Sequence, residues 1–167
     1  MQGKQTAIAI AHDQRSSLMQ IGLVSGLAGG LAEILWITAY SAGSNTSAAT
    51  VARGVSEAVG FGGGASPVAL GIIIHLLLAG ALGVAVVGLM RALPLRDRGW
   101  TVDLLLAVTA LSGVWAFNFL ILLPVLSPEF VTIVPMPVSF VSKLLFGLAA
   151  FVAFKASDAR TTISSRR

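Results

Sequence analysis

The stretch LAGGLAEILWITAY, residues 27–40, places a carboxylate in the middle of a long apolar segment. Glu33 is the one charged residue between Arg15 and Arg53. An apolar segment of about 20 residues is long enough to cross the hydrocarbon core of a bilayer as a helix. A charge at the centre of such a helix costs roughly 2.5–3.5 kcal/mol on insertion scales. We therefore expect Glu33 to point into the protein and to find a partner there.

The composition places the whole chain in the membrane class. Its 167 residues are 56% hydrophobic and 11% charged, whereas soluble domains carry about 25% charged residues. So few charges cannot cover a surface exposed to water. The net charge of +4 comes from basic residues scattered at the ends of apolar runs. Because they form no basic stripe with interleaved aromatic residues, we expect no nucleic-acid partner.

Four segments are long and apolar enough to span a bilayer, and none alternates with a period of two as a strand does. Stretches rich in glycine or proline separate them. The sequence therefore predicts an all-α integral membrane protein, a four-transmembrane-helix bundle within residues 18–156. We expect spans at about residues 18–41, 68–89, 102–123 and 138–156, between an N-terminal segment of residues 1–17 and a basic tail of residues 157–167.

Lysine and arginine are distributed unevenly between the two sides that four spans create. Nine of them fall in the terminal segments and the middle loop, and Arg53 alone falls on the other side. Because cytoplasmic loops carry an excess of basic residues, we expect both termini in the cytoplasm. This predicts a multi-pass protein of the plasma membrane, which in a bacterium is the inner membrane. The nine residues are Lys4, Arg15, Arg91, Arg96, Arg98, Lys155, Arg160, Arg166 and Arg167.

Residues 46–61, in the first outer loop, predict a short amphipathic helix. Thr46 or Ser47 is a suitable cap, the valines recur every four residues, and Arg53 and Glu57 form an i,i+4 pair on another face. One interpretation is a surface helix that connects two spans. The other is a lid hinged at the following GFGGG. We favour the surface helix, because glycine-rich loops are common connectors.

Each predicted span contributes one strongly polar residue, and all four lie at a similar depth. At about 1.5 Å per residue, they are roughly 8–12 Å below the outer ends of their spans. This coincidence predicts a polar cluster between the helices, in the outer third of the membrane. The four residues are Glu33, His75, Asn118 and Lys143.

Within this cluster, Glu33 and Lys143 carry opposite charges and are the expected partners. The long lysine stem also allows the alternative that Lys143 snorkels to the interface. His75 and Asn118 are expected to complete the hydrogen bonding. Trp115, one turn from Asn118, is expected to donate its indole N–H inside the cluster or to a backbone carbonyl. We favour a structural clasp that fixes helix register over a working proton or solute site.

Small residues predict which helix faces pack together. In membranes, small side chains let helix backbones approach closely. On the first span they recur every four residues, in two successive GxxxG steps, and similar faces occur on the second and fourth spans. The expected packing positions are Gly22, Gly26, Gly30, Gly71, Gly83 and Gly147.

The motifs of the common enzyme classes do not occur in the chain. There is no cysteine, and no HExxH, GxSxG or P-loop sequence is present. Catalytic metal sites usually take three protein ligands, and only Glu33 and His75 are suitable ones at the depth of the polar cluster. His75 is the one histidine within a span, so the chain cannot supply two histidines to a haem there. We expect no catalytic residues, no metal and no cofactor.

These features favour a small non-catalytic protein in the lipid bilayer that acts as an accessory, assembly or interaction subunit of a membrane complex. The alternative is a homo-oligomeric carrier or channel for protons or a small solute, which would use the outer polar cluster. Transporters usually show paired broken helices, internal repeats or a polar path to both sides. The sequence shows no such pair or repeat, and the spans are almost entirely apolar below the cluster. We therefore expect a membrane-protein partner, or failing that a homo-oligomer.

Overall fold

The structure is a computed structural model that describes the backbone of residues 2–63, 65–93 and 99–164, and the side chains within 16–63, 65–93 and 99–157. Every regular element in these ranges is helical. Residues 94–98, which hold two of the arginines counted for topology, and residues 165–167 of the predicted tail lie outside the described residues. The elements are α1 (Gln2–Ala42), α2 (Ala48–Ala58), α3 (Pro67–Ala92), α4 (Trp100–Phe117), η1 (Asn118–Leu122), α5 (Leu123–Leu126), α6 (Pro128–Ile133) and α7 (Met136–Ser164).

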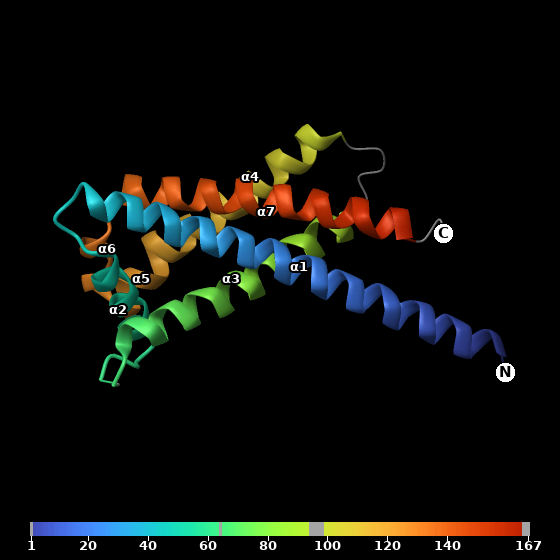
Figure 1. Ribbon diagram of the computed structural model, residues 1–167, viewed down its shortest axis with the longest axis horizontal. Coiled ribbons are helices and arrows are strands. Elements are labelled where there is room, and N and C mark those ends of the chain that lie inside the picture. The colour runs from blue at the N-terminus through green and yellow to red at the C-terminus, as the bar shows by residue number, and fades with distance from the viewer. Residues whose placement is uncertain (1, 64, 94–98, 165–167) are drawn as a thin grey trace.

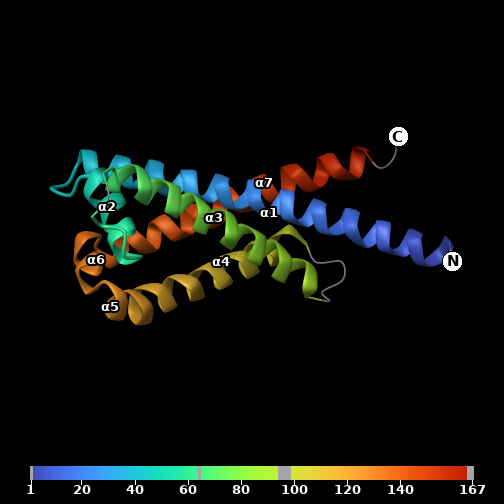
Figure 2. The same ribbon diagram turned by 90° about the horizontal axis from the view of Figure 1, so that it is seen from below.

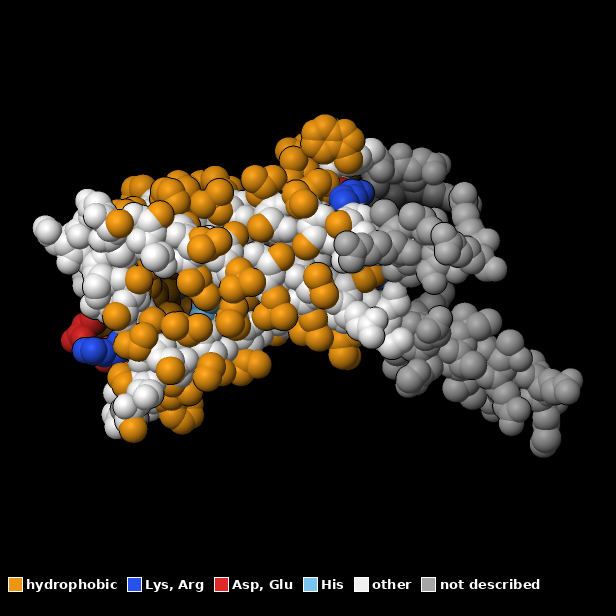
Figure 3. All heavy atoms as spheres, viewed as in Figure 1, with side chains coloured by type: hydrophobic (Ala, Val, Ile, Leu, Met, Phe, Trp, Pro, Cys, Tyr) orange, Lys and Arg blue, Asp and Glu red, His pale blue; other side chains and the backbone are white. Residues whose placement is uncertain are grey.

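Four of the helical stretches are long and apolar enough to cross a membrane, and they indicate a multi-pass membrane protein. They overlap the four spans expected from the sequence, and each boundary differs by at most three residues. Hydrophobic side chains cover the flank of the bundle in Figure 3, as lipid contact requires. The stretches are Ser16–Ala42, Pro67–Ala92, Trp100–Leu126 and Met136–Ser157.

Helix α1 lies at the centre of the arrangement (Figure 1). It packs against α3 along one side and against α7 along another, and these are the two most extensive helix contacts. Helix α4 packs mainly on α7 and meets α3 over a short stretch, beyond which α3 and α4 diverge (Figure 2). The first part of α1 and the last part of α7 project from the same end of the bundle.

Helices α2 and α6 close the other end of the bundle, which we call the capped end. Ser47 caps α2, because its side-chain oxygen accepts a hydrogen bond of 3.0 Å from the Thr50 N–H. α2 packs on the first turns of α3, and the Phe130 ring of α6 lies against Gly54 of α2. The short helix expected in this loop is therefore present, and one of its faces rests on the bundle.

Backbone contact between α1 and α3 depends on glycine. A Cβ added to Gly26 would collide with the Ala79 carbonyl, and one added to Gly83 would collide with the Gly22 carbonyl and with the backbone of Gly26. Gly22 likewise lies against the backbone of Val84. Since no side chain separates the two helices here, the GxxxG positions of α1 bring the two backbones into direct contact.

The other glycines expected at packing positions also lie at helix contacts. Gly30 faces the Ala79 methyl, Gly71 faces the Ala52 carbonyl of α2, and Gly147 faces Leu111 of α4. The structure adds three positions that the small-residue pattern did not single out. They are Gly29, which lies against the Phe146 ring, Gly54, which lies against Phe130, and Gly80, which lies against the Leu23 side chain of α1.

Gly83→Ala should therefore lower the free energy of unfolding by about 1–3 kcal/mol, the usual cost of overpacking a close contact. Gly88→Ala is the matched control on the same helix, because an added Cβ there meets nothing within 4 Å. The control should leave stability unchanged or raise it by up to about 1 kcal/mol through helix propensity. Reversible unfolding in mixed detergent micelles measures both. Equal losses in the two variants would contradict the close α1–α3 contact.

Candidate functional site: a buried carboxylate between α1, α3 and α7

Glu33 is buried, with 6% of its surface exposed, and it forms an ion pair with Lys143 of α7. The Lys143 Nζ lies 2.8 Å from the Glu33 Oε1. The Ser142 hydroxyl donates a hydrogen bond of 3.3 Å to the same oxygen. The ammonium also lies 4.9 Å from the centroid of the Phe146 ring, in a cation–π contact. Lys143 is therefore turned into the protein and does not snorkel away from it.

His75 of α3 lies beside this ion pair. Its Nε2 is 3.2 Å from the Gly30 carbonyl oxygen and 3.7 Å from the Glu33 Oε2. A carbonyl oxygen only accepts hydrogen bonds, so Nε2 carries the hydrogen in this contact. The His75 side chain is 27% exposed. On the face shown in Figure 3, the surface is hollowed near the capped end, and the colour of histidine is visible beside the hollow.

Trp115 lies outside this cluster and links α4 to α7. Its Nε1–H donates a hydrogen bond of 3.0 Å to the Ser139 hydroxyl, which donates in turn to the Met136 carbonyl oxygen at 2.9 Å. The indole also meets the Phe140 ring edge-on, with the centroids 4.9 Å apart. The sequence predicted a partner in the cluster or a backbone carbonyl, and the structure provides a hydroxyl on the neighbouring helix.

Asn118 is also separate from the charged residues. It begins the π-helical turn η1, and Pro124 follows six residues later. Proline has no N–H and its ring crowds the carbonyl four residues earlier, so it interrupts the regular hydrogen bonding of the turn that precedes it. Among the described residues, no hydrogen bond joins the Asn118 side chain to Glu33, His75 or Lys143.

A second ion pair, which the sequence patterns did not predict, lies toward the opposite end of the bundle. The Lys155 Nζ of α7 is 2.6 Å from the Oδ2 of Asp103, a buried residue in the first turn of α4. The Lys155 ammonium also lies 5.6 Å from the Phe151 and Phe154 ring centroids. Opposite charges near the facing ends of the third and fourth spans were the signal that could have revealed this pair.

A third polar link joins α1 to α7 close to the Glu33 pair. The Trp36 Nε1–H donates a hydrogen bond of 3.1 Å to the Val138 carbonyl oxygen. Trp36 lies three residues after Glu33 and Val138 five residues before Lys143, so the indole bond and the ion pair join α1 to α7 within about one and a half helical turns of each other. Buried indole N–H groups usually find such a partner.

The chemistry of the site follows from these contacts. One carboxylate, one ammonium and one imidazole meet between three helices, and the carboxylate is satisfied by a cation and a hydroxyl. In the described part of the chain, no three histidine, cysteine, aspartate or glutamate residues gather where they could hold a metal ion. The arrangement neutralises its own charges and connects α1 to α7.

No known protein family, curated protein sequence or solved structure matches this chain. Its fold and site define its class on physical grounds. The described residues form a helical bundle with an ion pair buried between its helices, and four of those helices are long and apolar enough to indicate a multi-pass membrane protein.

The ion pair predicts a large coupling energy between its two members. Glu33→Gln or Lys143→Met alone should lower the free energy of unfolding by about 3–5 kcal/mol, because each leaves a buried charge without its partner. The double variant should recover most of that loss. Reversible unfolding of the four proteins in the same detergent gives the coupling as a double-mutant cycle.

The second ion pair provides the matched control for this cycle. Lys155→Met removes a lysine from the same helix, but Lys155 pairs with Asp103 and not with Glu33. Its effect should add to that of Glu33→Gln without coupling. If the Glu33–Lys143 cycle is also additive, the two residues do not stabilise one another.

Proposed function

We propose that this chain is a small non-catalytic subunit of a membrane complex, which acts in the assembly of that complex or in interactions within it. The observation that carries the proposal is the uneven packing of the four spans. Only 11% of the apolar stretch in Trp100–Leu126 is buried, against 28–39% in the other three. This span packs mainly on α7, so most of its apolar surface is not covered by the rest of the chain. That surface is available for packing against a helix of another membrane protein.

The surface of this span that faces away from the bundle is built from large apolar side chains. Leu105, Leu120 and Ile121 are all more than half exposed. The polar side chain contacts of the span point the other way, since Asp103 and Trp115 both bind α7. Helix α4 is thus held on one side by specific polar contacts and is free to pack on a partner along the other.

The ion pair supports a structural role for the three-helix core. Glu33 is satisfied within the chain by Lys143 and Ser142, and it fixes α1 against α7. A buried pair of this kind is best attested as a device that sets register between helices. In the proposed role, the α1–α3–α7 core presents α4 to the partner.

The proposed orientation puts both termini in the cytoplasm and the capped end outside, in the plasma membrane, or the inner membrane of a bacterium. The nine-to-one distribution of basic residues supports this choice. The N-terminal part of α1 and the C-terminal part of α7 also project from one end of the bundle, as an even number of spans requires.

The second candidate function is a homo-oligomeric carrier or channel for protons or a small solute. The partial exposure of His75 favours it, because this residue lies beside the ion pair and the surface is hollowed near the capped end (Figure 3). Ionisable groups within membrane spans often mark such pathways. A carrier would use Glu33, His75 and Lys143, and it would need copies of the chain to complete the path.

Photo-crosslinking in native membranes separates the two functions. p-Benzoylphenylalanine placed at residue 105 on α4 should give one discrete adduct with a different membrane protein. The same group at residue 35 on α1 is the matched control, because Leu35 is also an exposed leucine on a span but lies on a helix already packed on two sides. It should give no protein adduct. Adducts of residue 105 with a second copy of this chain, or with lipid alone, would contradict the subunit proposal.

A further inference from the structure

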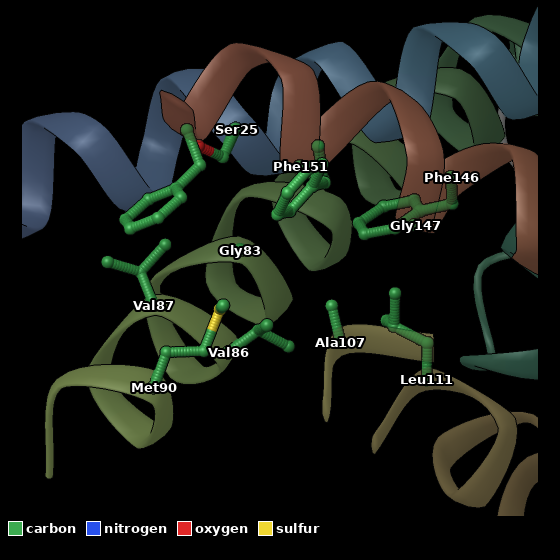
Figure 4. Close-up of a pocket in the computed structure, with 12 residues that line it drawn as sticks. Ser25, Gly83, Val86, Val87, Met90, Ala107, Leu111, Phe146, Gly147 and Phe151 are labelled. Atoms are coloured by element: carbon green, nitrogen blue, oxygen red, sulfur yellow. The ribbon is translucent and has the colours of Figure 1, made fainter. Parts of the chain in front are cut away.

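A small cavity lies inside the bundle, where residues from α1, α3, α4 and α7 meet (Figure 4). Its volume is about 20 Å³, which exceeds the roughly 10–15 Å³ that one water molecule needs. Its walls are almost entirely apolar. They include Gly83 of α3, Leu111 of α4, and Phe146 and Phe154 of α7, and Ser25 of α1 is the one polar side chain among them.

Ser25 is 1% exposed, and its hydroxyl has no hydrogen-bond partner among the described residues. Other serine hydroxyls of the bundle are satisfied. On the same helix, the Ser41 hydroxyl donates to the Ile37 carbonyl oxygen at 2.8 Å, and on α7 the Ser142 hydroxyl donates to Glu33. Buried hydroxyl groups almost always have a partner. Ser25 therefore brings an unmet hydrogen-bond donor and acceptor to the wall of the cavity.

The cavity also lies between the two ion pairs. One of its walls is the Phe146 ring, whose face carries the Lys143 ammonium. Another is formed by the Phe151 and Phe154 rings, which contact the Lys155 ammonium. A molecule in the cavity would thus touch the aromatic rings that support both lysines.

We propose that this cavity binds one water molecule, held by the Ser25 hydroxyl. Water is small enough for the volume, and it can form one hydrogen bond with the unmet hydroxyl, either by accepting from the Ser25 O–H or by donating to the Ser25 Oγ. The surrounding phenylalanine rings are weak acceptors for its remaining hydrogen. A purely apolar occupant would leave the hydroxyl without a partner.

This site goes beyond the proposed function and does not depend on it. It places a polar group between the Glu33–Lys143 and Asp103–Lys155 pairs, beside a cavity whose other lining side chains are apolar. The alternative state of the site is dry, with the Ser25 hydroxyl turned toward the carbonyl of Ile21, four residues earlier, as serine often does within a helix.

Solid-state NMR of the full chain in lipid bilayers tests the proposal. Magnetisation transferred from water protons should reach the carbon atoms of Ser25 and the methyl group of Ala107, which also lines the cavity. Ser25→Ala removes the hydroxyl but preserves the space, so transfer to Ala107 should be lost. Ser41→Ala is the matched control, because it removes a hydroxyl on the same helix that already bonds its own backbone. The control should keep the transfer.

Three outcomes would overturn the proposal. The first is that the unaltered chain shows no transfer to Ser25 and Ala107. The second is that transfer to Ala107 persists in Ser25→Ala, and the third is that it is lost in Ser41→Ala. The chemical shifts of Gly83 and Leu111, on opposite sides of the cavity, report whether each variant keeps its fold. The measurement on the unaltered chain needs no variant, so it decides the proposal even if Ser25→Ala does not fold.

Discussion

A carboxylate held between helices requires a cation at its own level, and this requirement determines how α1 and α7 pack. Glu33 finds the Lys143 ammonium 2.8 Å away, with Ser142 as a second partner. Removing either partner of such a pair usually costs about 3–5 kcal/mol, whereas sliding one helix by a turn would separate the charges by about 5.4 Å of helix rise. The register of α1 against α7 is therefore defined at this point, and the Trp36–Val138 bond supports it.

The contact between α1 and α3 follows a different rule. No charge pair sets it, and the backbones meet because Gly22, Gly26 and Gly83 have no side chains to separate them. Helix α1 therefore contacts its two neighbours in different ways. It is joined to α7 by an ion pair and hydrogen bonds, and it packs on α3 through direct backbone contact. Helix α4 joins this core through α7, by the Asp103–Lys155 pair and the Trp115–Ser139 bond. This leaves its other side open, which is the basis of the proposed subunit function.

The sequence was sufficient to predict the helical spans, the pairing of Glu33 with Lys143 and six of the packing glycines, because length, charge and side-chain size determine them directly. It could not place Asn118, because the apolar pattern predicts a regular α-helix there and does not reveal the π-helical turn that begins at this residue. It also missed the pairing of Asp103 with Lys155, because a single acidic residue near the start of a span does not indicate which helix its partner lies on. Ser25 gave no signal at all, because an isolated serine in an apolar run gains its significance from the cavity around it.

The central claim, that Glu33 and Lys143 form a direct buried ion pair, is tested most directly by a distance measurement in bilayers. The chain is labelled with ¹³C at the glutamate carboxyl groups and with ¹⁵N at the lysine ammonium groups. Dipolar recoupling should then detect one strong contact between a carboxyl carbon and an ammonium nitrogen, because the Glu33 Oε1 lies 2.8 Å from the Lys143 Nζ. This contact should vanish in Lys143→Met and persist in Lys155→Met, because Lys155 binds an aspartate. A contact that survives Lys143→Met, or no contact in the unaltered chain, would contradict the account.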